Sequence, residues 1–392
     1  MNILEEIQSC SVEWKELGEV CSVKKGKQLN KNLLIEDGLY PAYNGGQTYS
    51  GRTNDYNVEA NTIIVSQGGA SAGFVNFVDT KFWANAHCYY ILPDETRVNN
   101  RFVYHFVKMN QKYLMDFQHG AGIPALKADK LTKLLLPIPP QEIQEKIVQI
   151  LDKFTDYVTE LTSELTSRKK QYSFYRDKLL SFEDEVYQVE WKKLNECLKK
   201  GKGTKITASQ MKLLHKDGAP IRIFAGGKTY ADVNYGDIPD KDIHTEEAIV
   251  VKSRGIIDFE YCTEPFSFKN EFWSYSSDNE NINLRYIYHY LVHNKEHFQN
   301  IANNMQMPQI SSNDTEKFKI PVPSLEIQSR IVQVLDNFDT VCHDLNIGLP
   351  KEIELRQKQY EFFREKLLTF TAEGVYTDST VQYSTDKTSL GS

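Results

Sequence analysis

The feature that most constrains this chain is a long amphipathic segment, residues 141–182, that recurs at residues 325–370. Apolar residues in the first copy follow one another in alternating steps of four and three, which is the spacing of a coiled-coil seam. At about 1.5 Å of rise per residue, such a helix would be roughly 60 Å long. A helix of this length with one apolar stripe needs a partner, and the second copy supplies one.

The two copies predict which side chains pack between the helices. The candidate packing residues are Ile143, Ile147, Phe154, Leu161, Ile327, Ile331, Phe338 and Leu345. Alignment of Pro137 with Pro321 gives 11 identities in 18 positions, and alignment of Arg168 with Arg356 gives 10 identities in 15. The segments are therefore an internal repeat.

The second copy is longer than the first by four residues. The offset between the copies changes from 184 to 188, which places the surplus near Gly348, Leu349 and Pro350. The extra residues either add one seam step of four from Leu345 to Leu349, or are ejected as a bulge or kink by the glycine and proline. The sequence leaves both alternatives open.

The repeat extends beyond the helices. Residues 12–15, Val-Glu-Trp-Lys, recur at 189–192, and each copy opens a segment that ends in a proline-rich stretch before its helix. Residues 62–66 and 248–253 predict matching strands that end at glycine turns. We expect an α+β fold in which two mixed α/β modules form a tandem pseudo-symmetric repeat and alternate with two long helices.

The repeat also suggests where the parts of the chain begin and end. The expected parts are module 1 at residues 1–136, a central helical spacer at 137–185, module 2 at 186–320, a distal helical spacer at 321–371, and a tail at 372–392. The tail is rich in Ser, Thr and Asp, so we expect it to be disordered.

Several protein classes are disfavoured by composition. No run of about 18 apolar residues marks a membrane span, and the first residues lack the basic and apolar regions of a signal peptide. The six cysteines are scattered and form no C-x-x-C pair, so neither a zinc ribbon nor a disulfide framework is expected. We expect a cytoplasmic protein with free thiols.

Basic residues gather at two places although the net charge is −7. Eight basic residues and one acidic residue lie between Lys199 and Lys228, and a smaller cluster lies in module 1. The candidate phosphate contacts are Lys24, Lys25, Lys27, Lys199, Lys200, Lys202 and Lys205. Two separate patches suit a nucleic-acid backbone held at two points, whereas a merely solvated charge run is the alternative.

Matching loops in the two modules carry polar tips. Residues 45–49 align with 226–230, and Ser66 aligns with Ser253. The candidate DNA-reading residues are Gly45, Gly46, Gln47, Thr48, Tyr49, Ser66, Gln67 and Gly68 in module 1, and Gly226, Gly227, Lys228, Thr229, Tyr230, Ser253 and Arg254 in module 2. Arg and Gln side chains at such tips read guanine and adenine edges, although all these residues also suit ordinary turns.

No sequence pattern supports catalysis. His293 to His297 fit the H-x-x-E-H pattern of a zinc protease, but the equivalent positions in module 1 are Met109, Lys112 and Tyr113. The chain contains neither a G-x-x-x-x-G-K-[ST] phosphate loop nor the Asn-Pro-Pro-Tyr or Asp-Pro-Pro-Tyr tetrapeptide of an adenine methyltransferase. We expect a non-catalytic chain that holds no metal or cofactor.

The proline-rich stretches before the helices carry a resemblance to a known family. Residues 136–148, Leu-Pro-Ile-Pro-Pro-Gln-Glu-Ile-Gln-Glu-Lys-Ile-Val, recur in related form at 320–332. This lead, its duplication and the order of modules and helices resemble the specificity subunit of a type I restriction-modification enzyme. The resemblance covers nearly the whole chain, from about residue 12 to residue 370.

The resemblance implies that each module is a target recognition domain that reads one part of a split, asymmetric sequence in double-stranded DNA. The two spacer helices would pair antiparallel and fix the gap. Two methyltransferase subunits would dock along them, joined by restriction (endonuclease and translocase) subunits. S-adenosylmethionine, ATP and Mg²⁺ would then bind to those partners, and no membrane would be involved.

Three alternatives remain beside this interpretation. One is a stand-alone bipartite DNA-binding protein such as a repressor. Another is a coiled-coil adaptor without a DNA function. A third is the specificity subunit of a related methyltransferase and nuclease fusion system.

Overall fold

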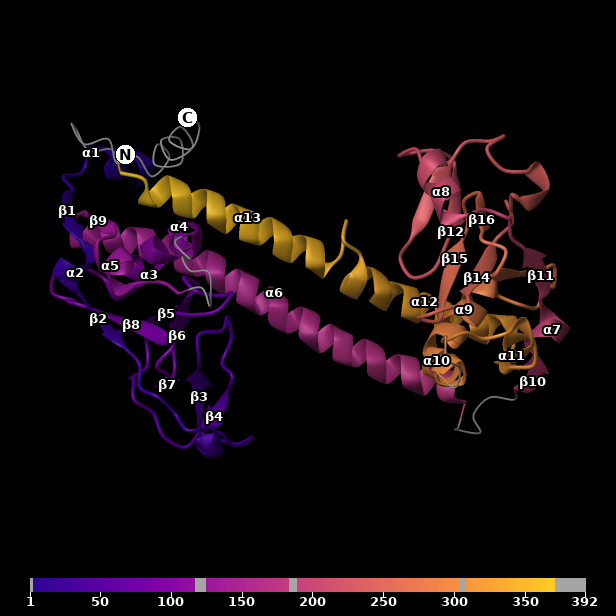
Figure 1. Ribbon diagram of the computed structural model, residues 1–392, viewed down its shortest axis with the longest axis horizontal. Helices are drawn as coiled ribbons and strands as arrows, with labels where there is room; N and C mark the ends of the chain where they lie inside the picture. The colour runs from indigo at the N-terminus through magenta and orange to yellow at the C-terminus, as the bar shows by residue number, and fades with distance from the viewer. Residues whose placement is uncertain (1–2, 117–124, 183–188, 304–306, 371–392) are drawn as a thin grey trace. The chain divides into compact units, whose positions relative to one another are not determined.

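The computed structural model describes residues 3–116, 125–182, 189–303 and 307–370. The chain forms two compact units, one made of residues 1–162 and 353–392 and the other of residues 163–352. Each unit contains one module and a part of both long helical segments (Figure 1). The expectation of a disordered tail at 372–392 lies outside the described residues.

In its described residues, unit 1 contains three small sheets. The four-stranded sheet has the order β2 (Cys21–Lys25), β8 (Cys88–Pro93), β5 (Thr62–Ser66), β6 (Val75–Val78), and all its neighbours are antiparallel. The three-stranded sheet has the order β4 (Gly51–Thr53), β3 (Tyr40–Tyr43), β7 (Trp83–Ala84), with β3 and β7 parallel. Strand β1 (Glu13–Glu16) pairs with β9 (Leu135–Ile138). Every residue of β5 is buried, as expected for a strand covered on both faces.

Short helices surround these sheets. They are α1 (Ile3–Ser9), α2 (Leu17–Val20), the 3₁₀ turn η1 (Lys31–Leu33), α3 (Asn100–Met109), α4 (Gln111–Asp116) and α5 (Ala128–Thr132). The apolar face of α3 packs on the four-stranded sheet, and Phe102, Val103 and Val107 are buried there. Helix α3 is therefore the helix that closes module 1.

Unit 2 repeats this topology. The four-stranded sheet has the order β11 (Lys199–Lys202), β17 (Trp273–Ser276), β14 (Ala248–Lys252), β15 (Asp258–Cys262). The three-stranded sheet has the order β13 (Tyr230–Val233), β12 (Ile221–Phe224), β16 (Phe266–Phe268). Strand β10 (Glu190–Lys193) pairs with β18 (Lys319–Val322). Its short helices are α7 (Leu194–Cys197), α8 (Ala208–Leu214), η2 (Asp240–Asp242), α9 (Leu284–His293), α10 (Lys295–Asn303) and α11 (Ser312–Glu316). The same strand orders in both modules confirm the predicted α+β tandem repeat.

The first long helix is continuous, as predicted. Helix α6 runs over 41 residues from Gln141 to Ser181, and Phe182 leaves the helical conformation with φ of 50°. In unit 1 the Phe154 ring stacks on Phe363, with centroids 5.1 Å apart. In unit 2 Tyr172 contacts Phe338 and His343, each at 5.7–5.8 Å, and Tyr175 contacts Phe338. This order of contacts is that of antiparallel helices.

The second long segment is interrupted, which corrects the expectation of one helix. It consists of α12 (Leu325–His343) and α13 (Leu349–Leu368). Leu345 lies in the interruption and is 71% exposed, so its predicted packing role is wrong. The Gly348 N–H donates to the Asp344 carbonyl, and a Cβ on Gly348 would lie 2.4 Å from the Thr340 carbonyl oxygen. The bulge alternative is therefore confirmed.

The predicted seam holds only in part. Ile143, Ile147 and Ile331 are buried, and Phe154, Leu161, Ile327 and Phe338 are half-buried. Tyr157 and Val341, which also lie on the seam spacing, are exposed, whereas Leu151 and Leu335 are fully buried. The first turns of α6 and α12 lie against the core of their own module, so a second stripe of the helix is buried there as well.

A buried glutamine fixes the start of each long helix to its module. The Gln144 side chain donates to the Pro139 carbonyl and accepts from the backbone N–H of Asn99, both at 2.8 Å. Asn99 in turn caps α3 through the N–H groups of the first turn. Gln328 makes the same two contacts in unit 2, with Pro323 and Asn283, also at 2.8 Å.

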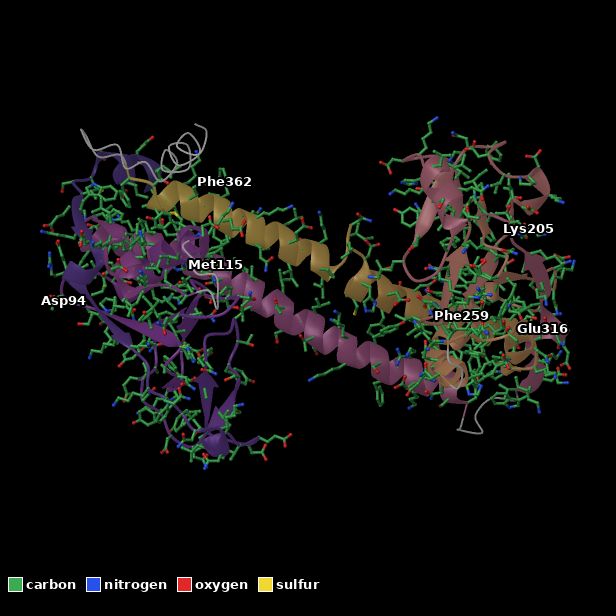
Figure 2. All side chains as sticks on the ribbon, viewed as in Figure 1. Asp94, Met115, Lys205, Phe259, Glu316 and Phe362 are labelled. Atoms are coloured by element: carbon green, nitrogen blue, oxygen red, sulfur yellow. The ribbon has the colours of Figure 1, made fainter. Side chains whose placement is uncertain are left out.

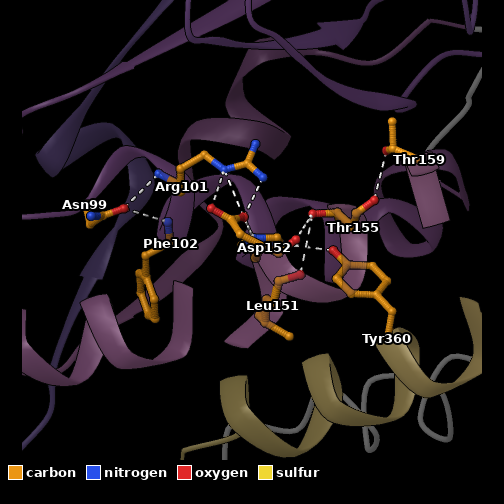
Figure 3. A network of polar contacts seen from close by, with 9 residues as sticks. Asn99, Arg101, Phe102, Leu151, Asp152, Thr155, Thr159 and Tyr360 are labelled. Atoms are coloured by element: carbon orange, nitrogen blue, oxygen red, sulfur yellow. Dashed lines mark hydrogen bonds and ion pairs between the residues drawn. The ribbon is translucent and has the colours of Figure 1, made fainter. Parts of the chain in front are cut away.

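A second junction joins α3 to both long helices within unit 1 (Figure 3). His105 Nε2 lies 2.7 Å from the Asp152 carboxylate on α6, and His105 Nδ1 lies 2.9 Å from the Tyr360 hydroxyl on α13. Arg101 forms an ion pair with Asp152 at 2.5 Å. Burial lowers the pKa of His105. Burial acts to raise the pKa of Asp152, but hydrogen bonds from His105 and Arg101 outweigh it and lower that pKa.

The same junction recurs in unit 2 with the two long helices exchanged. Arg285 and His289 on α9 contact Asp336 on α12 at 2.9 and 2.7 Å. Tyr172 of α6, the repeat equivalent of Tyr360, hydrogen-bonds Asp339. Burial is the main cause that raises the pKa of Tyr172, so its hydroxyl keeps its proton. Each module is thus attached to both long helices of its own unit.

Replacement of Gln144 by Ala should lower the free energy of unfolding of unit 1 by about 1–3 kcal/mol, because the Asn99 N–H would lose its buried acceptor. Urea denaturation, followed by a probe placed in unit 1, measures this change. The matched control is Gln149→Ala, because Gln149 lies on the same helix and is exposed. Equal midpoints for the two variants would contradict the structural role of Gln144.

The stability of the module junctions should fall as the pH drops below about 6.5, the ordinary pKa of histidine. The lowered pKa of His105 means that the unfolded chain binds more protons than the folded chain in this window, so stability increases with pH up to about 6.5. Urea midpoints at pH 7.5 and 5.5 measure the slope. His105→Gln should reduce it, and the exposed His87→Gln should leave it unchanged.

Candidate nucleic-acid interface

Each module presents a glycine loop that ends in a half-exposed tyrosine. The loop 45–49 follows β3, the loop 226–230 follows β12, and Tyr49 and Tyr230 are each 49% exposed. The Arg52 guanidinium lies 5.9 Å from the centroid of the Tyr49 ring, and that of Arg222 lies 4.2 Å from the Tyr230 ring. Such cation–π contacts hold the two rings in place while one part of each ring faces solvent.

The two loops turn at different glycines. Gly45 has φ of 81° in module 1, whereas Gly227 has φ of 60° in module 2. Both conformations are left-handed and favour glycine. Because Gly45 aligns with Gly226, the turn lies one residue later in module 2, and the side chains of Gln47 and Lys228 leave differently shaped turns.

Polar groups of the neighbouring strands hold the loop of module 1 from behind. The Ser66 hydroxyl donates to the Gly46 carbonyl at 3.0 Å, and the Asn76 amide donates to the Gln47 carbonyl at 2.7 Å. The Gly45 N–H donates to the Cys88 sulfur at 3.2 Å. Burial raises the pKa of the Cys88 thiol to about 11, so the sulfur remains protonated. Ser66 therefore lies behind the loop tip, with only 5% of its surface exposed.

Strand register corrects the predicted alignment of the segments after the central strands. Ile63 pairs with Phe77, and Ile249 pairs with Tyr261. Phe77 and Tyr261 are equivalent, because the junction arginines Arg101 and Arg285 lie over their rings at 4.3 and 4.6 Å.

Ser66 is therefore equivalent to Lys252, rather than to Ser253. The next residues keep the same offset between the modules. Gly68 forms an isolated β-bridge to the segment before α5, and Arg254 forms one to the segment before α11. Ser253 takes the position of Gln67 and is itself buried, with its hydroxyl donating to the Glu271 carbonyl. Arg254 is exposed, so of the two candidates Ser253 and Arg254 it is the one that presents its side chain to solvent.

The lysines of the two basic patches differ in their pairing. Lys24, Lys25 and Lys27 lie on or just after the edge strand β2 and are exposed. In module 2, Lys199 forms an ion pair with Asp278, and Lys200 forms one with Glu316 at 2.5 Å. These two positive charges are partly neutralised within the protein.

Lys202 and Lys205 (the latter labelled in Figure 2) are exposed. Across the parts of the chain that the structure describes, neither has an ion-pair partner within 4.0 Å. Thr204, which lies between these two lysines, donates its N–H to the Phe268 carbonyl. Lys269, the residue after Phe268, donates its N–H to the Phe224 carbonyl at the end of β12. These lysines therefore lie on the side of the module from which the loop 226–230 starts.

Module 1 brings Lys27 to its loop in a similar way. The Lys27 N–H donates to the Ala84 carbonyl, and Ala84 pairs with Tyr43 at the end of β3. In each module, then, the glycine loop, the end of the strand before it (β3 or β12) and one or two lysines gather at one end of the sheets. Lys24 and Lys199 lie farther along their strands from this end.

Several residues at this end were not found from the sequence. Arg52 follows Tyr49 by three residues, but Arg222 precedes Tyr230 by eight, so the two contacts share no spacing that a pattern search can detect. Lys252 did carry a signal in the sequence, because it is a charged residue at the end of an otherwise apolar run. In the structure only 3% of it is exposed. Asn76 and Glu260 gave none.

The histidine pattern that suggested a zinc protease is not formed. His293 is the last residue of α9, and His297 belongs to the next helix, α10, after the break at Asn294. Among the described residues, His289, Asp336 and Asp339 bring donor atoms within 4.8 Å of one another. This group is the unit 2 junction, where Arg285 already pairs with Asp336.

None of the helices in the described ranges is long and apolar enough to cross a membrane.

Comparison with known proteins matches this duplicated architecture. Residues 11–168 and 188–355 each match the type I restriction modification DNA specificity domain. The type I restriction enzyme EcoR124I/EcoR124II specificity subunit of Escherichia coli is 31% identical, over 94% of this chain and 97% of its own length. A putative type I restriction enzyme specificity subunit of Haemophilus influenzae is 30% identical, over 93% of this chain and 97% of its own.

The fold is also that of a solved structure. The crystal structure of a type I restriction-modification system S subunit from M. genitalium superimposes with a TM-score of 0.69 at 21% identity, over 93% of this chain and 98% of that one. Two matched domains, relatives that align over nearly their full length, and this shared fold agree with one another. The chain belongs to the family of type I restriction-modification specificity subunits.

Proposed function

We propose that each module of this specificity subunit reads one half of a bipartite, asymmetric site in double-stranded DNA, and that the paired long helices set the gap between the halves. The main support is that both modules carry the same glycine loop in the same place with different side chains at the tip, Gln47 in one and Lys228 in the other. Equivalent frames with different tips suit two readers of different sequences.

The domains that follow from this proposal are recognition domain 1 at residues 1–136, a central spacer at 137–185, recognition domain 2 at 186–320 and a distal spacer at 321–371. Within them, Gln47 suits an adenine edge, and Lys228 and Arg254 suit guanine. Lys27, Lys202 and Lys205 suit backbone phosphates, which position the protein without reading sequence.

Chemistry and assembly belong to partners in this proposal. Methyltransferase subunits, two for each chain, would dock on the long helices, with restriction subunits joining them and with S-adenosylmethionine, ATP and Mg²⁺ bound to these partners in the cytoplasm. Two exposed aromatic residues support docking by two like partners. Phe174 and Phe362 occupy equivalent positions of the repeat and are 62% and 55% exposed.

Selection from random duplexes tests the proposal. The full chain, assembled with a methyltransferase partner subunit, should enrich DNA with two specified blocks separated by an unspecified gap of constant length. Enrichment of a single continuous block, or of none, would overturn the proposal. A variant with four residues inserted in α6, made by repeating Glu160 to Ser163, adds about 6 Å of helix.

That insertion should lengthen the gap by about one or two base pairs, since adjacent base pairs are about 3.4 Å apart. It should leave both specified blocks unchanged. The substitution Ser163→Ala, at an exposed position of the same segment, is the length-preserving control. New blocks in the insertion variant would show that the helix does more than set distance.

Replacement of Lys202 and Lys205 by Met should weaken binding to all sequences and reduce the slope of log K against log salt by about 0.9 for each DNA phosphate that the variant no longer neutralises. Fluorescence anisotropy at several salt concentrations measures the slope. Lys241→Met is the control, because Lys241 is equally exposed on η2. Weaker binding confined to one DNA sequence would mean that these lysines contact bases instead.

A further inference from the structure

A lysine is buried at the end of the central strand of module 2. Lys252 is the last residue of β14, whose other residues are all apolar, and it is 3% exposed. A buried ammonium group is costly unless its charge is paired and its protons are hydrogen-bonded. Its contacts therefore indicate what this position does.

Lys252 connects three parts of the module. Its ammonium group donates to the Gly227 carbonyl in the glycine loop at 2.9 Å and to the Glu260 carboxylate on β15 at 2.5 Å. It also lies 5.4 Å from the centroid of the Phe224 ring at the end of β12. The loop is thereby tied to the central strand and to its neighbour.

The equivalent positions of module 1 do the same with other side chains. By strand register, Lys252 is equivalent to Ser66, and Glu260, which pairs with Val250, is equivalent to Asn76, which pairs with Ile64. Ser66 holds the Gly46 carbonyl and Asn76 holds the Gln47 carbonyl.

These side chains hold their loops by arms of different length. A lysine reaches its acceptor through four methylene groups and a serine through one. In both modules the held carbonyl belongs to the second glycine of the pair, whereas the left-handed turn lies at the first glycine of module 1 and the second of module 2. The two modules thus differ both in the residues that support the loop and in the conformation of the loop.

We infer that Lys252 and Glu260 are positioning residues for DNA recognition by module 2. They fix the backbone of the loop 226–230, and with it the direction of Lys228 and Thr229, without contacting DNA. Ser66 and Asn76 do this for module 1. The inference rests on the proposed function, because it assigns the support of the loops to which that function gives sequence reading.

The test compares DNA selected by the full chain and by three variants, each assembled with the methyltransferase partner. Lys252→Met keeps the length of the arm but removes its donor. It should lower discrimination at least tenfold at positions in one block of the bipartite site and leave the other block unchanged. Ser66→Ala should do the reverse. Lys252→Arg, which keeps a charged donor, should restore part of the discrimination.

A fourth variant, Glu260→Gln, guards against simple misfolding of the module. Glu260→Gln keeps a side-chain oxygen acceptor and removes the charge, so it should reduce discrimination in the same block by less than Lys252→Met. If Lys252→Met and Glu260→Gln both select the same blocks as the wild type, the inference is overturned. An equal decrease in both blocks, together with a lower unfolding midpoint, would also overturn it, because the role would then be only structural. If the wild type selects no bipartite site, the proposed function itself fails.

Discussion

The hydrogen bond between a buried histidine and an aspartate on a long helix is the interaction on which the rest of each unit depends. In unit 1 it joins His105 to Asp152, and in unit 2 it joins His289 to Asp336. Apolar contacts alone between the long helices and the helix that closes each module would allow sliding and rotation. A directional bond to a buried group instead specifies one orientation, and the glycine loops inherit it through the sheets on which α3 and α9 pack.

The internal repeat explains why both units work in the same way although unit 1 is split between two separate parts of the sequence. Tyr360 of the distal segment completes the junction of unit 1, and Tyr172 of the central helix completes that of unit 2. A duplicated sequence can satisfy both junctions only if each long segment serves one unit with its first half and the other with its second half. The division of the chain between residues 162 and 163 and between residues 352 and 353 follows this exchange.

Much of the fold could be predicted from the sequence, because apolar spacing along α6 and repeated strings such as Val-Glu-Trp-Lys report local structure directly. The candidate loops were found for the same reason. The interruption at Leu345 was left open, because it depends on a hydrogen bond from Gly348 and on the closeness of Thr340. Ser66 was matched with Ser253 by residue type, whereas strand pairing decides the true equivalence with Lys252. Long-range pairing of this kind leaves no pattern in one sequence.

The distribution of unit 1 over both ends of the chain has a consequence for synthesis on the ribosome. Domains generally fold in the order in which they emerge, from the N-terminus onward. Here the apolar surface of Ile147 and Leu151 shares a core with Leu367, which is translated more than 200 residues later. Unit 2 occupies one uninterrupted stretch, so it can be completed while the core of unit 1 still lacks its last helix. The half of the protein that is made first is therefore the last to be finished.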